Sequence, residues 1–279
     1  MRRPLPGTVV TDGVNSVISD GLGHFRWKGR ANALSFIKPG FSDKLVPLKS
    51  GLSLPVELRV SSLRGRLAWR VDGARTELSG LESALGAWAK SKLRRYPEVD
   101  LNQVDLLVLL MPRGLASSET IRILNWVRRG GRLLVCGEWG GERDFDKTCV
   151  NALVQPAGIQ FTGATLKSNA EDPFRLVVTT PEAAPLLSLE ARDAVTMWGT
   201  CELSLSGPAR PLLVSKTSAY SVLAIGDNHV VAAVGPLGRG KVMAVADTSL
   251  WRDSDSSGVG KPNLETGANR RLLERLLVW

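Results

Sequence analysis

Apolar residues in the first 78 positions alternate with polar ones, and this pattern predicts a β-rich N-terminal segment. Leu67, Trp69 and Val71 are separated by single neighbours, which is the period-two pattern of a half-buried strand. Turn signals such as Asp72-Gly73 separate the apolar segments. The expected strands are Thr8–Thr11, Ala33–Ile37, Val56–Val60 and Leu67–Val71, with Arg64-Gly65 joining the last two in a hairpin.

The pattern changes to helical spacing at Ser79. Leu81, Leu85 and Leu93 fall on one helical face, and Ser79 with Glu82 three positions later has the form of a capping box. We therefore expect a helix that begins at Ser79 and ends before Pro97.

Two continuous apolar runs follow, Val104–Leu110 and Arg132–Cys136, and such runs are typical of strands buried on both faces of a parallel sheet. Between them the spacing predicts a helix that begins at Ser117 or Ser118, ends near Arg129 and stops at Gly130-Gly131. Its expected inward residues are Ile121, Leu124, Trp126 and Val127. The whole reads as a β-α-β unit with a right-handed crossover.

The rest of the chain is predicted to be mainly β and to end in a helix. A short helix is expected over Lys147–Val154, and a final helix from Asn263 onward. The last two of the expected strands read as a hairpin closed by Gly238-Arg239-Gly240. The expected strands are Leu176–Thr179, Leu212–Lys216, Ser221–Ile225, Val230–Val234 and Lys241–Ala246.

Composition and charge narrow the class of protein. In 279 residues, 36 Lys and Arg against 27 Asp and Glu leave a net charge of +9. That charge admits an anionic partner, but the basic residues are scattered in pairs and do not alternate with aromatic ones, so nucleic acid is not favoured. Three widely spaced cysteines form neither a disulfide framework nor a zinc knuckle. With no apolar stretch long enough for a signal peptide or a membrane span, a cytoplasmic location is expected.

Three motifs, in order, carry a resemblance to a known superfamily. They are Gly130-Gly131-Arg132 after the predicted helix, Gly238-x-Gly240-Lys241-Val242 leading to Asp247, and Asn269 opening the last helix. Together they resemble the class I glutamine-amidotransferase-like superfamily. The similarity is greater to its non-catalytic branch, which includes bacterial domains of unknown function, gliding-motility-type transporter auxiliary proteins and GIFT-type domains of intraflagellar transport.

The resemblance implies a fold and a domain division. The fold is α/β, with a flavodoxin-like, mostly parallel sheet that carries helices on both faces and has β-rich N-terminal and middle insertions. Residues 1–78 are then a β-rich segment that belongs to the same domain or to its own, and residues 79–279 form the amidotransferase-like domain, with an insertion at about 160–220. Ligands of such sheets bind at the carboxyl ends of the strands.

The same resemblance implies that the catalytic triad is absent. In catalytic relatives a cysteine occupies a strand-to-helix elbow, and a His and a Glu follow a later strand. Here the elbow is Gly137–Gly141, with Trp139 in the place of the nucleophile, and the later strand runs into Asp247-Thr248-Ser249 without a His. The resemblance therefore favours a non-catalytic binding or scaffold subunit whose partner is another protein in a larger assembly.

Several side chains stand out as candidate ligand contacts near that carboxyl edge. Glu138 and Asp247 could face one cleft, although Asp247 could instead cap the turn that follows it. Asn269 could bond to backbone across the cleft or cap the last helix. Cys136 is expected in the core, and His229 as a solvated hairpin residue. The full candidate set is His24, Glu138, Trp139, Asp247, Thr248 and Asn269.

Two alternatives to the scaffold hypothesis stay open. One is a cleft hydrolase, or a carbohydrate- or nucleotide-binding protein, that uses Glu138 and Asp247. The other is a protein that binds nucleic acid or another anion through its positive charge. No cofactor and no metal site are predicted, because no His, Cys, Asp and Glu spacing fits one.

Overall fold

The computed structural model describes residues 8–11, 16–28, 33–37, 44–47, 66–72, 78–89, 93–137, 149–181, 187, 189, 194–215, 219–220, 225–226, 228–254 and 261–278. The expected strand Val56–Val60, its hairpin turn, Glu138, Trp139 and the loop around them lie outside these residues.

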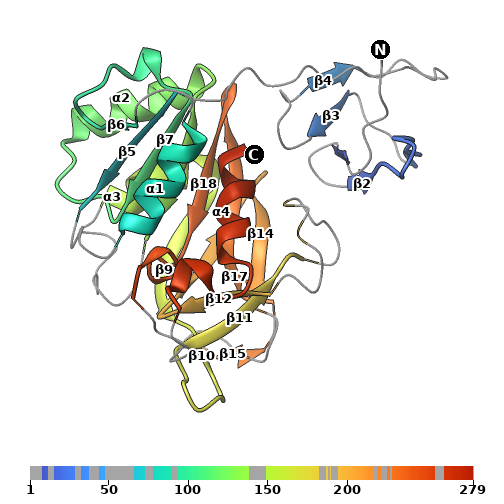
Figure 1. The fold of residues 1–279 in the computed structure, drawn as a ribbon. Coiled ribbons are helices and arrows are strands. Elements are labelled where there is room, and N and C mark those ends of the chain that lie inside the picture. Colours follow the sequence, from blue (N-terminus) through green and yellow to red (C-terminus); the bar gives the residue numbers. More distant parts are fainter. Residues whose placement is uncertain are drawn as a thin grey trace.

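The fold is α/β, built on one large mixed sheet of nine strands (Figure 1). Neighbouring strands run antiparallel from β12 to β18 and parallel from β18 to β6. In spatial order the strands are β12 (Val195–Trp198), β11 (Arg175–Thr179), β14 (Arg210–Ser215), β17 (Val230–Leu237), β18 (Gly240–Val245), β8 (Arg132–Cys136), β7 (Leu106–Leu110), β5 (Leu67–Val71) and β6 (Arg94–Arg95).

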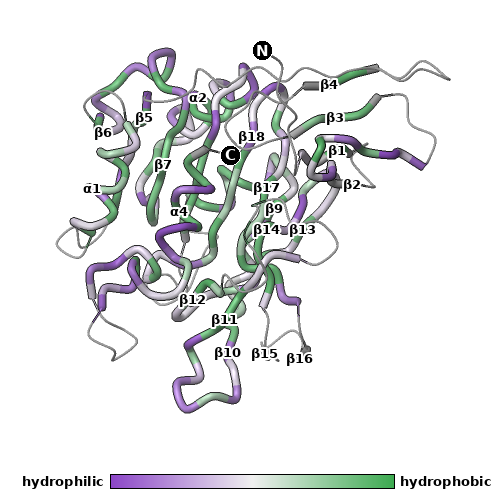
Figure 2. The backbone as a smooth tube through the Cα atoms, turned by 45° about the vertical axis from the view of Figure 1, so that its right-hand side comes forward, coloured by the Kyte–Doolittle hydropathy of each residue, from purple (hydrophilic) through white to green (hydrophobic). Residues whose placement is uncertain are grey.

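The predicted β-α-β unit is confirmed. β7 and β8 pair in parallel and are fully buried, as their continuous apolar runs indicated, and helix α2 (Ser117–Arg128) joins them. Gly130 ends the helix region with a φ of 119°, a conformation that favours glycine. Figure 2 shows the hydrophobic character of β7 along its length.

Two details of α2 differ from the prediction. The residue before the helix is Ala116, and no serine side chain caps it. Ile121 is 56% exposed, so its assignment to the inward face was wrong, and Ile123 is buried instead. The buried stripe runs through Thr120, Ile123, Leu124 and Val127. Position 121 lies outside that stripe, because each helical residue turns the chain by about 100° and so rotates it away from Thr120.

Leu67–Val71 forms a strand as predicted, but this strand lies inside the large sheet. β5 pairs in parallel with β7 over its whole length and with β6 on its other side. The segment 1–78 therefore contributes a parallel strand, second from one end, to the sheet of residues 79–279. The reason is burial: Leu67, Ala68 and Trp69 are at most 4% exposed, which a hairpin at the surface would not provide.

Helix α1 (Ser79–Trp88) begins where it was predicted, but the expected capping box does not form. The carboxylate of Asp253, far away in sequence, accepts hydrogen bonds from the backbone N–H groups of Ser79 and Gly80 and from the Ser79 hydroxyl, at 2.7–2.8 Å. This carboxylate supplies the acceptor that a capping residue would otherwise provide.

The remaining elements are short. β17 and β18 form the predicted hairpin. The final helix, α4 (Asn269–Val278), begins later than Asn263, because residues 263–265 form a separate 3-10 turn, η6 (Asn263–Glu265). The other helical elements are α3 (Cys149–Val154), η2 (Leu101–Gln103), η4 (Gln155–Ala157) and η5 (Ser249–Trp251).

Three smaller sheets accompany the large one. One pairs β9 (Ile159–Thr165) with β13 (Cys201–Leu205), and neither of these strands was predicted. A second contains β10 (Lys167–Ser168), β15 (Ala219–Tyr220) and β16 (Ile225–Gly226). β15 ends just before the expected strand Ser221–Ile225 and β16 begins at its last residue, and residues 221–224 lie outside the described part of the chain. The third is N-terminal, with the order β2 (Ser16–Ile18), β1 (Val9–Thr11), β3 (Ala33–Ile37) and β4 (Lys44–Pro47).

Side chains of the large sheet are divided between two buried clusters, because neighbouring residues of a strand point to opposite faces. Leu67, Trp69 and Val71 share one cluster with residues of α1 and α4. Ala68 belongs to the other, which contains residues of α2 and α3. No described helix is both long and apolar enough to span a membrane.

Candidate functional site

The carboxyl ends of β8 and β18 lie side by side, since Cys136 pairs with Val245. Gly137 follows β8 and donates its N–H to the carbonyl of Val245, 3.0 Å away. Asp247 and Thr248 follow β18 and lead into η5. The sequence also placed Glu138 and Trp139 at this edge, but these two residues are not among the described ones. Of the two carboxylates predicted to face one cleft, the described residues therefore include Asp247.

Asp247 is completely buried and is bonded to backbone on both carboxylate oxygens. Its Oδ2 accepts from the N–H of Trp198 at 2.7 Å, and its Oδ1 accepts from the N–H of Ser249 at 2.5 Å. A carboxylate buried in this way stabilises two N–H groups that would otherwise lose their solvation. The geometry agrees with the capping interpretation of Asp247.

Asn269 is also completely buried, and its side chain pairs with a strand as a neighbouring strand would. Its Oδ1 accepts from the N–H of Thr196 at 3.0 Å, and its Nδ2 donates to the carbonyl of Thr196 at 2.9 Å. The same Nδ2 donates to the carbonyl of Asn263 at 2.8 Å. Asn269 thus bonds to backbone, one of the two roles expected for it.

Asp247 and Asn269 together cover the outer edge of β12. This strand is the last of the nine, and the N–H groups of Thr196 and Trp198, two residues apart, are both bound by these side chains. Exposed strand edges pair readily with other chains unless they are covered. Two of the three motifs of the resemblance therefore supply side chains that close the sheet.

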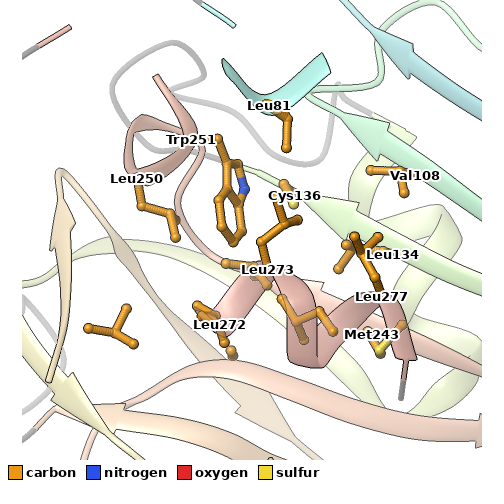
Figure 3. Close-up of a cluster of buried hydrophobic side chains, with 14 of the residues drawn as sticks. Leu81, Val108, Leu134, Cys136, Met243, Leu250, Trp251, Leu272, Leu273 and Leu277 are labelled. Atoms are coloured by element: carbon orange, nitrogen blue, oxygen red, sulfur yellow. The ribbon is translucent and has the colours of Figure 1, made fainter. Parts of the chain in front are cut away.

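Cys136 lies in the core, as expected, beneath Trp251. Figure 3 shows the indole ring of Trp251 beside the Cys136 side chain, with Leu81 and Leu273 nearby. Burial raises the pKa of this thiol from 9.0 to about 12; a hydrogen bond from Trp251 opposes the rise, and the charge of Asp247 adds to it. Only the thiolate is a strong nucleophile, so Cys136 is unreactive near neutral pH.

Trp251 itself belongs to the core. It is 1% exposed and ranks among the largest fully buried side chains of the described residues. Its indole ring lies beside the side chain of Cys136 (Figure 3). The signal for this burial was available in part, because Leu250 precedes Trp251 and both follow an apolar strand.

The two histidines lie in separate parts of the fold. His24 is exposed, in a turn after β2, where its N–H donates to Asp20 at 2.8 Å. That hydrogen bond lowers the pKa of Asp20. His24 therefore belongs to the N-terminal sheet, and no described contact joins it to Asp247.

His229 was predicted to be solvated, and this prediction was wrong. Its side chain is 6% exposed, and its Nδ1 lies 2.8 Å from Oε1 of Glu202 on β13. Its backbone N–H also donates to the hydroxyl of Ser215. Sequence reasoning missed the pair because β13 was not predicted as a strand, although Cys201–Leu205 alternates apolar and polar residues, so nothing placed Glu202 over the start of β17.

A second polar cluster, which the sequence analysis did not identify, lies at the carboxyl ends of β5 and β7. Asp72 accepts from Nε of Arg70 at 3.0 Å and from the N–H of Arg113 at 2.8 Å, and Arg70 donates to the carbonyl of Arg113 at 2.9 Å. Oε1 of Glu119 lies 3.9 Å from Nη1 of Arg70. The charges of this cluster are paired with one another. Together these contacts hold the loop after β7 against β5. Within the described part of the chain, no three His, Cys, Asp or Glu side chains gather as metal ligands would.

Comparison with known proteins identifies a family and a similar fold. A family model described as a domain of unknown function (DUF4350) matches residues 81–277. No curated protein matches the sequence. The cytoplasmic protein STM1381 from Salmonella typhimurium LT2 is similar in structure with a TM-score of 0.54 at 10% identity, over 76% of this chain and 97% of that one. This likeness shows a shared fold.

A β-galactosidase from Rahnella sp. R3 is similar at a TM-score of 0.45 and 19% identity, over 66% of this chain. The match covers 29% of that enzyme, so the chain spans less than a third of its length.

Proposed function

The chain belongs to the DUF4350 family, and we propose that it is a non-catalytic, amidotransferase-like binding and scaffold domain of a larger protein assembly. The proposal has three parts: the arrangement of the sheet, the absence of nucleophile chemistry at the elbow position, and a protein as the partner.

The proposed arrangement is flavodoxin-like, with helices on both faces. Numbered along the chain, the five parallel strands β6, β5, β7, β8 and β18 have the spatial order 2-1-3-4-5. This is the strand order of flavodoxin-like folds. The division of α1 and α4 from α2 and α3 between two buried clusters supports the placement of helices on both faces.

The observation that carries the non-catalytic assignment is the environment of Cys136. This is the cysteine adjacent to the elbow, and its thiol is 0% exposed, covered by Trp251, with a pKa of about 12. A catalytic cysteine needs an adjacent base or a helix N-terminus that lowers its pKa. The environment of Cys136 changes the pKa in the opposite direction.

The hydrogen bonds of the polar residues at the carboxyl edge also support the non-catalytic assignment. Asp247 and Asn269 are bonded to the backbone of β12, and acid–base work at this edge would require a carboxylate that can reach a substrate. The hydrolase hypothesis needs Asp247 in that role, and its burial disfavours it.

A protein partner suits the surface better than nucleic acid does. Binding of single strands relies on exposed aromatic side chains on which bases stack. Four of the six described tryptophans are at most 6% exposed, namely Trp69, Trp126, Trp198 and Trp251. The other two, Trp27 and Trp88, are partly buried against hydrophobic clusters, so the described tryptophans offer little surface for stacking. A cytoplasmic location is part of the proposal, because all three cysteines are free thiols.

The test is an activity assay on the purified chain and its Cys136→Ser variant. Glutamine hydrolysis and p-nitrophenyl acetate cleavage are followed for both proteins at neutral pH. We expect no rate above the buffer control and no difference between the two proteins. A measurable rate that disappears in Cys136→Ser would overturn the proposal.

A further inference from the structure

The two glycine motifs of the sequence meet at the amino edge of the large sheet, opposite the edge discussed above. Arg132, which begins β8, pairs with Lys241 of β18, and the N–H of Lys241 donates to the carbonyl of Gly131. The glycines permit a very close approach of backbones. A Cβ at Gly240 would lie 2.1 Å from the carbonyl oxygen of Val127, at the end of α2.

This close contact brings three arginines from two elements together. Arg128 and Arg129 end helix α2, and Arg239 lies at the tip of the β17–β18 hairpin. The N–H of Arg239 donates to the carbonyl of Arg128 at 2.9 Å. Gly238 beside it has a φ of 62°, and a Cβ there would lie 2.7 Å from the same carbonyl oxygen, so the hairpin tip is fixed against the helix end.

The charges of this group, which we call the arginine patch (Arg128, Arg129 and Arg239), are not neutralised within the described structure. All three side chains are exposed. Arg128 donates to the neutral amide of Asn125, and none of the three makes an ion pair with a described carboxylate. The buried carboxylate at this edge, Asp105, is bonded to Arg66 through two hydrogen bonds of 2.6 and 2.8 Å.

The helix dipole explains part of the patch but not all of it. Cations are favoured near a helix C-terminus, which accounts for Arg128 and Arg129. Arg239 comes from a hairpin tip that a backbone hydrogen bond holds against the end of α2, so the helix dipole does not account for its presence there. Exposed arginine side chains that extend from adjoining backbone, with no described counter-charge, suit the binding of carboxylate or phosphate groups.

We propose that the arginine patch is the docking surface for an acidic segment of a partner protein, whose Asp and Glu carboxylates bind the guanidinium groups. This inference rests on the proposed scaffold function and specifies the chemistry of the partner. Guanidinium forks bind carboxylates with two parallel hydrogen bonds, so arginine suits this task better than lysine. Nucleic acid fits less well, since the aromatic residue at this place, Trp126, is 5% exposed and packs under Gly131.

The test uses fluorescein-labelled hexaglutamate as the probe, with binding to the full chain followed by fluorescence anisotropy. The patch variant is Arg128→Gln, Arg129→Gln, Arg239→Gln. The control variant, Arg94→Gln, Arg95→Gln, Arg175→Gln, loses the same net charge from exposed positions elsewhere. An unlabelled DNA duplex serves as a competitor, and circular dichroism checks that both variants are folded.

We expect the affinity of the patch variant for the peptide to be at least about tenfold lower than that of the unaltered chain. The affinity of the control variant should fall much less. Equal losses in both variants would show that only net charge matters, and would overturn the proposal. Absence of peptide binding to the unaltered chain would also overturn it, as would duplex DNA displacing the peptide at lower concentration than unlabelled hexaglutamate does. None of these outcomes affects the activity test of Cys136, so failure of the docking surface is distinguishable from failure of the scaffold function.

Discussion

Removal of the Asp247 carboxylate should strongly destabilise the protein. In Asp247→Ala the N–H groups of Trp198 and Ser249 both lose a buried, charged acceptor, at 2.7 and 2.5 Å. Hydrogen bonds to charged groups contribute about 1.5–3 kcal/mol each, and buried N–H groups left without a partner add to the loss. Two such bonds predict a decrease of about 3–6 kcal/mol in the free energy of unfolding.

Asp247→Asn separates the charge and the shape of this side chain. Asparagine keeps one carbonyl oxygen but presents an NH₂ group to the other N–H, so one of the two hydrogen bonds is lost. We expect a smaller decrease, about 1.5–3 kcal/mol. Unfolding in urea, followed by tryptophan fluorescence, measures both variants, and Glu171→Ala, at an exposed position, is the control, with an expected change within about 0.5 kcal/mol.

The opposite result would refute the structural role of Asp247. A carboxylate kept for function is often neutral or costly for stability, so its removal would leave the unfolding free energy unchanged or raise it. If both Asp247 variants unfold within about 0.5 kcal/mol of the unaltered chain, Asp247 does not hold the edge of β12.

Three further predictions concern stability. His229→Ala should lower the free energy of unfolding by about 1–3 kcal/mol, because Glu202 loses its buried partner, whereas His24→Ala, at the exposed histidine, should change it little; thermal unfolding compares them. Gly240→Ala should lower the free energy of unfolding by about 1–3 kcal/mol, because its Cβ would clash with backbone. Gly86→Ala lies in a helix with open space around it, so it should raise the free energy of unfolding by about 0.5–1 kcal/mol in the same assay. Asp253→Ala removes the cap of α1, so it should lower the free energy of unfolding by about 0.5–2 kcal/mol at pH 7.

The Asp253 effect should also depend on pH. Burial raises the pKa of this carboxyl, but hydrogen bonds from Ser79 and Gly80 outweigh it and hold the pKa below its ordinary value of 3.8. The bound carboxylate therefore stabilises the fold above about pH 4, and this contribution is lost as the pH falls through the lowered value. The gap between the unaltered chain and Asp253→Ala should shrink in that range, and a gap that widens on acidification would contradict the assignment.

The centre of the fold could be predicted from local pattern because its signals are strong. Continuous apolar runs marked β7 and β8, and Gly130-Gly131 marked the end of α2 between them. Strands β9, β12 and β13 were missed. β12 is buried at every position and therefore shows no alternation, whereas β9 and β13 do alternate between more buried and less buried residues, so their period-two signal was present but was not recognised.

Long-range partners were the part that the sequence could not provide. The residue that caps α1 is 174 positions away from Ser79, so the local capping box was a reasonable but wrong prediction. The pairing of His229 with Glu202, and of Asn269 with Thr196, likewise depends on strands whose positions follow from the tertiary fold. Asp247 was correctly recognised as a candidate cap, but its second contact, with Trp198, required the structure.

The reactivity of Cys136 in the folded chain tests the central claim most directly. The native protein is incubated with iodoacetamide at pH 8, and mass spectrometry of peptides follows the modification of each of the three cysteines, with the urea-unfolded chain as the reference. Because the buried thiol has a pKa of about 12, Cys136 should remain unmodified while the partly exposed Cys149 reacts, and should react only after unfolding. Modification of Cys136 in the native protein at least as fast as in the unfolded chain would contradict the account, because it would reveal an accessible and activated thiolate next to the elbow.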